Sequence, residues 1–357
     1  MPDVRVDAFD AARGLAVLAM VWLHFVPEAN EDAGALARCL GWTVDVGAGV
    51  PSTLFFLLAG VAWACSARRV GAEALALRPA WVARRSLALA AVGVPFWVWA
   101  WPNDVLTAFA LALPCVALLQ WWGRTALASA LVLLVLAIPC AARAFGGYVA
   151  GDLLADSTHL ANHGFGWETL RWFLYVGSYP LLPWLCPPLL GALLAMNGRT
   201  DAARWKRWIA LGAVMVALGL AADALAARAG DLLGDVAGDF AVTWQPTSIP
   251  FLLRNGGVAV LLVGAVAWRG MTRGLPGWLW PVAAVGRMSL SHYLGHVLLV
   301  FAPLRLWWPD EDWGMAVGVA AALGYALFAL AASAWWFRGR ARGPLEAWLG
   351  RASGPSR

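Results

Sequence analysis

The stretch RGLAVLAMVWLHF (residues 13–25) places a cation, Arg13, and an imidazole, His24, at the two ends of an otherwise apolar run. On an α-helix the eleven steps between them make three turns plus about 20°, so both side chains share one face, roughly 16 Å apart along the axis. A guanidinium is well shaped to bind phosphate, and a neutral imidazole can accept a proton. Ionisable residues inside a membrane helix are candidates for function, although an arginine is also suited to anchor the helix at the inner interface.

The segment GRMSLSHYLGH (286–296) holds a second group of polar residues. Ser289, His292 and His296 follow at i, i+3 and i+7, so they share a helix face, with Tyr293 beside them. If this helix runs from inside to outside, His296 lies at the depth of His24. His292 and His296 also have the i, i+4 spacing of a metal-binding pair, but no acidic or third ligand is apparent at that depth, and we predict no metal. The structural alternative is a seam of hydrogen bonds between helices.

The elements that position these residues must be membrane helices. Of the 357 residues, 61% are hydrophobic and 13% are charged, whereas soluble domains are about a quarter charged. The net charge of +5 does not indicate nucleic-acid binding, because nearly all the basic residues are arginines at helix ends, where they orient helices in a bilayer. The 24 tryptophans suit the two interfacial belts. The five cysteines show no metal-binding spacing and are interpreted as small apolar residues.

Ten apolar runs of membrane-spanning length lie near residues 12–27, 48–66, 84–101, 104–122, 125–142, 174–196, 207–227, 248–268, 280–301 and 313–337. With the amino terminus in the cytoplasm, 19 of the 26 basic residues fall inside and the outer loops are acidic, as the positive-inside rule requires. We therefore predict an all-α polytopic membrane protein with both termini cytoplasmic. Residues 1–357 are expected to form one domain, with helices over about 12–337, a long outer loop near 143–173, and a basic cytoplasmic tail over 338–357.

Several segments resemble the transmembrane acyltransferase superfamily. FDAARGLAVLAMVWLH (9–24) resembles its opening helix, with the Arg-x10-His pattern of the acyltransferase-3 branch, and FFLLAGVAWACSARR (55–69) resembles its second helix. Later segments are similar to bacterial relatives of heparan-alpha-glucosaminide N-acetyltransferase, namely YPLLPW (179–184), QPTSIPFLL (245–253) and GRMSLSHYLGHVLL (286–299). Residues 28–47 lack the His of the first outer loop in the lysosomal enzyme of that group. The catalytic assignment therefore follows the acyltransferase-3 pattern.

The resemblance implies transfer of an acetyl or other short acyl group from cytoplasmic acyl-CoA to an extracytoplasmic or membrane-embedded acceptor. The acceptor is expected to be a glycan or a lipid head group. The residues implied are His24 and His296 for catalysis, with His24 as base or acyl carrier; Arg13, Arg84 and Arg85 for CoA binding; and Tyr293, His292 and Ser289 for the substrate.

Two interpretations from other classes stay open. A transporter or flippase for an amphipathic envelope molecule would also need polar groups at mid-membrane, but no inverted repeat that would favour it is apparent. The second interpretation is a non-catalytic protein that helps to assemble the machinery for envelope polysaccharides. Acyl-CoA binding by the purified protein separates both from the enzyme. The expected location is the bacterial cytoplasmic (inner) membrane. The expected partners are lipid, acyl-CoA and the acceptor, without nucleic acid, and a homo-oligomer stays open.

Overall fold

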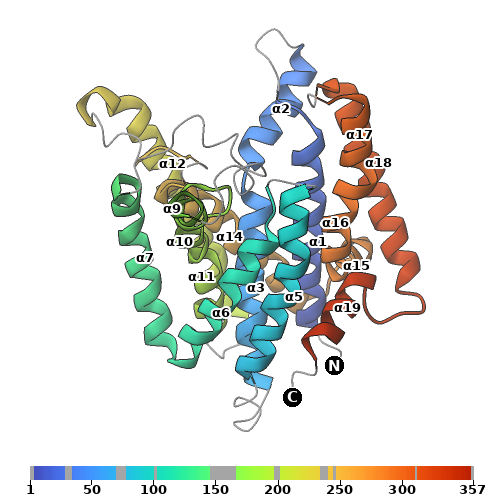
Figure 1. The fold of residues 1–357 in the computed structure, drawn as a ribbon, viewed down its shortest axis with the longest axis horizontal. Helices are drawn as coiled ribbons and strands as arrows, with labels where there is room; N and C mark the ends of the chain where they lie inside the picture. Colours follow the sequence, from blue (N-terminus) through green and yellow to red (C-terminus); the bar gives the residue numbers. More distant parts are fainter. Residues whose placement is uncertain are drawn as a thin grey trace. The chain divides into compact units, whose positions relative to one another are not determined.

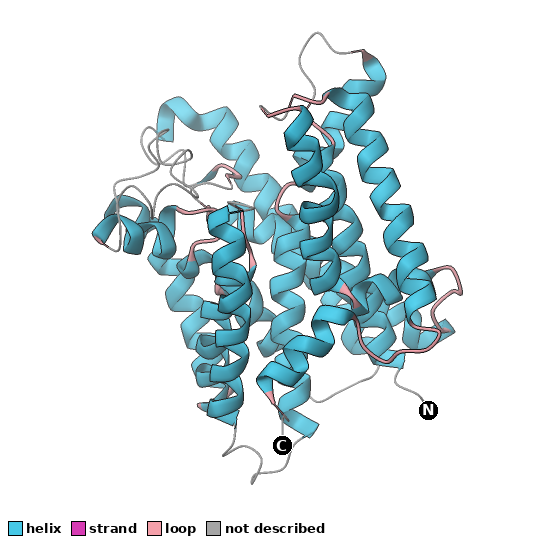
Figure 2. Ribbon diagram, turned by 45° about the vertical axis from the view of Figure 1, so that its right-hand side comes forward, coloured by secondary structure: helices cyan, strands magenta, loops and turns pink. Residues whose placement is uncertain are grey.

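The computed structural model describes residues 4–28, 34–69, 78–99, 103–144, 166–196, 202–233, 240–243, 247–309 and 312–354. Every regular element within these ranges is a helix (Figure 2). The all-α class expected from the sequence is therefore confirmed. Most of the predicted outer loop, residues 145–165, lies outside the described residues.

The helices are those of an integral membrane protein. Six stretches are long and apolar enough to cross a membrane, namely Ala8–Phe25, Ala35–Cys65, Arg124–Ala141, Ala202–Ala229, Ile249–Arg273 and Gly314–Trp336. Two shorter apolar stretches add to them, Leu106–Trp121 and Leu181–Met196. Each of the ten runs expected from the sequence coincides with a helix or with consecutive helical segments. The count of ten and the cytoplasmic location of both termini stay predictions.

The chain divides into two compact units. The first comprises Met1–Ser52 and Leu262–Trp348, and the second comprises Thr53–Leu261 and Leu349–Arg357. The borders fall inside three helices, α3 (Val50–Arg69), α14 (Ile249–Arg273) and α19 (Pro344–Ser353).

The first unit is built around the amino-terminal helix. Besides parts of α3, α14 and α19, its elements are α1 (Val4–Phe25), α2 (Ala35–Gly47), α15 (Leu279–Arg287), α16 (Ser289–His296), the π-helix η4 (Val297–Phe301), α17 (Ala302–Trp307) and α18 (Gly314–Trp336). α1 packs against α15, α16 and α18 (Figure 1). The helix that carries Arg13 and His24 is thus the neighbour of the helix that carries His296.

Glycines bring α1 and α15 into backbone contact. A Cβ atom at Gly14 would overlap the carbonyl group of Val282, and one at Gly286 would overlap the carbonyl group of Asp10. Small residues permit this close approach between membrane helices. The contact fixes the register of α1 against the segment that leads into α16.

The expected ninth span is not one continuous helix. α15 ends at Arg287, and Met288, with φ −112° and ψ 26°, interrupts the helix before α16 begins at Ser289. After His296 the chain continues as the π-helix η4. π-helical segments are frequent at functional sites, and here α16 lies between an interruption and a π-helix.

The second unit contains most of α3 and the first half of α14, together with α5 (Arg78–Trp99), α6 (Leu106–Trp121), α7 (Arg124–Ala144), α9 (Trp167–Arg171), the π-helix η2 (Trp172–Val176), α10 (Leu181–Trp184), α11 (Cys186–Met196) and α12 (Ala202–Leu233). Glycines again allow backbone contact, because a Cβ atom at Gly60 of α3 would overlap the carbonyl group of Pro188 in α11. Aromatic rings fill the core beside it, with Phe56 stacked on Phe109 at a centroid distance of 4.1 Å.

Candidate functional site

The structure brings the two catalytic candidates into direct contact. Nδ1 of His24, near the end of α1, lies 2.8 Å from Nε2 of His296, the last residue of α16. The two ring centroids are 5.0 Å apart with an interplanar angle of 25°. One of these nitrogens must donate and the other must accept, so at least one of the two rings keeps a lone pair in this contact.

The two histidines differ in exposure. His296 is completely buried, with 0% of its surface exposed, whereas His24 is half-buried. The ring of Phe25 also covers His296 edge-on, at a centroid distance of 6.2 Å. Of the two rings, only that of His24 is partly accessible from outside the packed helices, and a catalytic role for either histidine stays a prediction.

His292 extends this contact to α18. Its Nε2 lies 2.7 Å from the hydroxyl of Ser333, and its Nδ1 lies 3.3 Å from the hydroxyl of Tyr325. The carbonyl oxygen of His292 accepts two further hydrogen bonds, from the Tyr325 hydroxyl at 3.1 Å and from Nδ1 of His296 at 3.2 Å. Both ring nitrogens of His292 are therefore engaged by side chains of α18, and contact of His292 with a substrate stays a prediction.

Tyr325 and Ser333 were not among the residues singled out from the sequence. Both are buried, and they are the two hydroxyl-bearing residues of α18, whose sequence is otherwise apolar or Gly. That apolar context is the available signal, since polar side chains within a membrane helix mark functional or helix-pairing positions.

The other two residues predicted to contact substrate lie on the same short helix. Tyr293 is buried, and its ring centroid is 5.9 Å from that of His296. Ser289 begins α16 and is half-buried. Tyr293 thus lies beside His296, as the helical spacing predicted, and contact of either side chain with a substrate stays a prediction.

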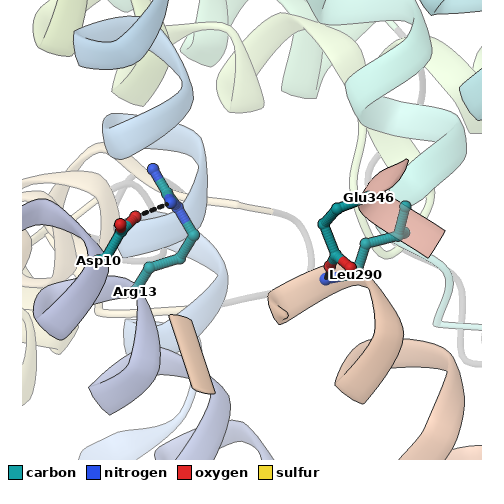
Figure 3. Close-up of polar contacts among 4 residues, drawn as sticks. All are labelled: Asp10, Arg13, Leu290 and Glu346. Carbon is teal, nitrogen blue, oxygen red and sulfur yellow. Dashed lines mark hydrogen bonds and ion pairs between the residues drawn. The ribbon is translucent and has the colours of Figure 1, made fainter. Parts of the chain in front are cut away.

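Arg13 is held by an ion pair within α1. Its Nη1 donates to Oδ1 of Asp10 at 2.6 Å, one turn earlier in the helix (Figure 3). Asp10 is buried, whereas 24% of the Arg13 side-chain surface is exposed. The carboxylate orients the guanidinium, which has five N–H donors in total. The i, i+3 spacing in FDAARG could have predicted this pair.

Arg84 and Arg85 belong to α5 in the second unit. Nε of Arg84 donates to the carbonyl oxygen of Ser353 at 2.8 Å. The guanidinium of Arg85 lies over the ring of Trp81, 5.4 Å from its centroid. Arg84 is exposed and Arg85 is half-buried. Both side chains have structural partners, and their binding of CoA stays a prediction.

The carboxylate of Glu346, in α19, caps the start of α16 (Figure 3). Its Oε1 accepts the backbone N–H groups of Leu290 at 2.7 Å and of Ser291 at 3.0 Å, and its Oε2 accepts the Ser291 hydroxyl at 2.7 Å. The interruption at Met288 leaves the first N–H groups of α16 without a preceding turn, and a carboxylate there satisfies them and meets the positive end of the helix dipole. Glu346 thereby fixes the helix that carries His296.

The site thus offers a half-buried imidazole, a buried histidine behind it, and a carboxylate-oriented guanidinium on the same helix. Within the described part of the chain, no group of three or more His, Cys, Asp or Glu side chains is arranged to hold a metal ion. These residues suit proton transfer or transient attachment of an acyl group at His24.

Fold and site together define an integral membrane protein with a histidine pair at a helix–helix contact. Over residues 5–225 the sequence matches the family described as Heparan-alpha-glucosaminide N-acetyltransferase, catalytic. This match covers more than half of the chain, and the chain belongs to this family. Membership implies an acyltransferase. The relationship predicted from the sequence is therefore confirmed, while the Arg-x10-His pattern of the acyltransferase-3 branch stays a prediction.

A second family, described as Protein of unknown function (DUF418), matches residues 193–353. The histidine pair therefore joins a residue of the first matched region, His24, to a residue of the second, His296. Comparisons with curated proteins and with solved structures gave no match.

Proposed function

We propose that the protein is an acyl-CoA-dependent acyltransferase that moves an acetyl or other short acyl group from cytoplasmic acyl-CoA to an extracytoplasmic or membrane-embedded glycan or lipid head group. The observation that carries the proposal is the contact between half-buried His24 and fully buried His296 in a member of an acetyltransferase family. A half-buried ring held by a fully buried one suits a general base or a covalent carrier.

His24 has two chemical routes. As a base, it takes the proton of an acceptor hydroxyl or amine while the acceptor attacks the thioester carbon; the C–S bond breaks and the proton passes to the CoA thiolate. As a carrier, its lone pair attacks the thioester and displaces the CoA thiolate, and the acceptor then takes the acyl group and loses its proton to that thiolate. In both routes His296 holds the ring of His24 in place.

Arg13 is the leading residue for the CoA moiety. It lies on α1 together with His24, roughly 16 Å away along the helix, a distance that an extended pantetheine arm can span. Asp10 pre-orients the guanidinium, and the remaining N–H groups are suited to bind a phosphate in bidentate fashion. Arg84 and Arg85 are the further candidates. In this proposal both termini are cytoplasmic and the membrane is the bacterial inner membrane. The three arginines then lie at the cytoplasmic side, where acyl-CoA is found.

The test is substitution of His24 by glutamine, which keeps hydrogen-bonding groups but offers no basic or nucleophilic ring nitrogen. Transfer of labelled acetyl from acetyl-CoA to an envelope extract should fall about 10²- to 10⁴-fold, whereas acyl-CoA binding should be retained. Purification of the labelled product identifies the acceptor. A fully active His24→Gln enzyme would contradict the mechanism but not the family assignment.

The interrupted span from α15 to α16 also suits a transporter, because discontinuous helices line the binding sites of many transporters. Acyl-CoA binding separates the two functions. Purified protein that binds no acyl-CoA, but moves an amphipathic molecule across vesicles, would favour the transporter.

A further inference from the structure

The hydrogen bonds around His296 determine where its proton lies. Nδ1 of His296 is 3.2 Å from the carbonyl oxygen of His292. A carbonyl oxygen only accepts, so Nδ1 carries the hydrogen and, in a neutral ring, Nε2 carries the lone pair. That lone pair faces Nδ1 of His24 at 2.8 Å, which must then donate. The neutral His24 ring therefore has its lone pair on Nε2.

The α18 side of the network can be assigned in the same way. The Tyr325 hydroxyl lies 3.1 Å from the carbonyl oxygen of His292 and 3.3 Å from Nδ1 of the same residue. Its single hydrogen must point to the carbonyl, because otherwise two acceptor oxygens would face each other. Nδ1 of His292 then donates to the Tyr325 oxygen, and Nε2 of His292 accepts from the Ser333 hydroxyl at 2.7 Å.

This network orients groups and does not conduct protons. Two donors, the Tyr325 hydroxyl and Nδ1 of His296, converge on the carbonyl oxygen of His292. A backbone carbonyl has no proton to hand on, so a proton that reaches His24 cannot continue to α18 by this route. The hydrogen bonds of Tyr325 and Ser333 therefore act on geometry and on the choice of tautomer.

The packing of α16 makes room for this arrangement. An ideal Cβ atom at position 295 would lie 2.6 Å from the Tyr325 hydroxyl oxygen, so glycine at this position lets the hydroxyl reach the helix backbone. The Tyr325 ring also meets the ring of His296 at a centroid distance of 6.3 Å and an angle of 68°. Tyr325 thus contacts both the ring of His296 and the carbonyl to which that ring donates.

We propose that Tyr325 and Ser333 are positioning residues, which hold His292 so that His296 keeps its proton on Nδ1 and His24 keeps its own proton on Nδ1, with its lone pair on Nε2. Their effect on rate rests on the proposed acyltransferase function. Their effect on the tautomers does not, because it exists without any substrate.

The test is ¹⁵N NMR of the full-length protein, labelled at histidine, in lipid nanodiscs. The chain has five histidines, so each signal can be assigned by a single His→Gln substitution. The wild type should show His24 and His296 protonated on Nδ1 only. In Tyr325→Phe and Ser333→Ala, His292 should lose its single tautomer, and a measurable fraction of His24 should move its proton to Nε2. Tyr175→Phe and Ser353→Ala, which alter buried hydroxyls elsewhere, are the matched controls and should leave all three signals unchanged.

Kinetics supply the second readout. Tyr325→Phe should lower kcat about tenfold and Ser333→Ala about threefold, with KM for acyl-CoA unchanged. Wild-type His24 protonated on Nε2, or variants with unchanged His24 signals and unchanged kcat, would overturn the proposal. If no acyl transfer is found at all, the proposed function fails, while the tautomer measurement still decides the positioning role.

Discussion

Replacement of Glu346 by alanine should release the start of α16. The carboxylate accepts three hydrogen bonds, from the N–H groups of Leu290 and Ser291 and from the Ser291 hydroxyl. A helix cap contributes about 0.5–2 kcal/mol, and one more hydrogen bond adds about 0.5–1.5 kcal/mol. Glu346 is half-buried, so solvent screens part of its charge. We expect a local loss of about 2 kcal/mol for Glu346→Ala and about 1 kcal/mol for Glu346→Gln, which keeps one acceptor oxygen.

Hydrogen–deuterium exchange measures this loss locally. A local loss of about 2 kcal/mol should speed exchange of the α16 amides about 30-fold, and the ordering should be alanine, then glutamine, then wild type. Arg351→Ala is the control, because Arg351 is an exposed charge on the same helix, α19. Unchanged exchange of α16 in Glu346→Ala would show that Met288 and the neighbouring helices hold α16 without the cap, and would refute the reasoning.

Three further predictions concern the donor site, the packing and the topology. Arg13→Ala should weaken acyl-CoA binding, with a smaller effect on dephospho-CoA donors if the 3′-phosphate is its target; unchanged affinity in a folded variant would reduce Arg13 to an interface anchor. Gly286→Ala should lower the thermal midpoint in detergent, because the added methyl overlaps the backbone of α1 and overpacking typically costs about 1–3 kcal/mol. Gly324→Ala, at an open helical position, should not lower it. Reporter fusions at Gly151 and Gly354 should give opposite signals, and matching signals would mean that the helix count is off by one.

The sequence was sufficient to find His24 and His296, for a physical reason. An ionisable group in an apolar helix is costly unless it has a partner, so each histidine implied something polar beside it. Their equal expected depth on two helices pointed to the pair. The sequence does not give the distance of 2.8 Å between the two rings or the glycine contacts of α1 with α15, because both depend on how the helices pack.

Other parts of the site could not be predicted from the chain alone. Glu346 lies 50 residues beyond His296 in a basic tail, and a capping contact over such a separation has no local signature. The interruption at Met288 was also missed, because the one proline of the expected span, Pro281, lies seven residues before it and residues 280–301 were interpreted as a single membrane-spanning run. Tyr325 and Ser333 were visible as polar residues in an apolar helix, but their partner on another helix was not.

The π-helix η4 adds one residue to the helical turn that follows the histidine pair. His296 and Phe301 are both buried, although leucines 298 and 299 between them are exposed. In an α-helix, two residues five apart point about 140° away from each other, whereas the i→i+5 bonding of a π-helix brings them to one side. One extra residue inserted into an α-helix produces a bulge of this form. A relative without this extra residue should show a one-residue gap within residues 297–301. Its aromatic residue at the position of Phe301 should then be exposed, or a different side chain should be buried beside the histidine pair.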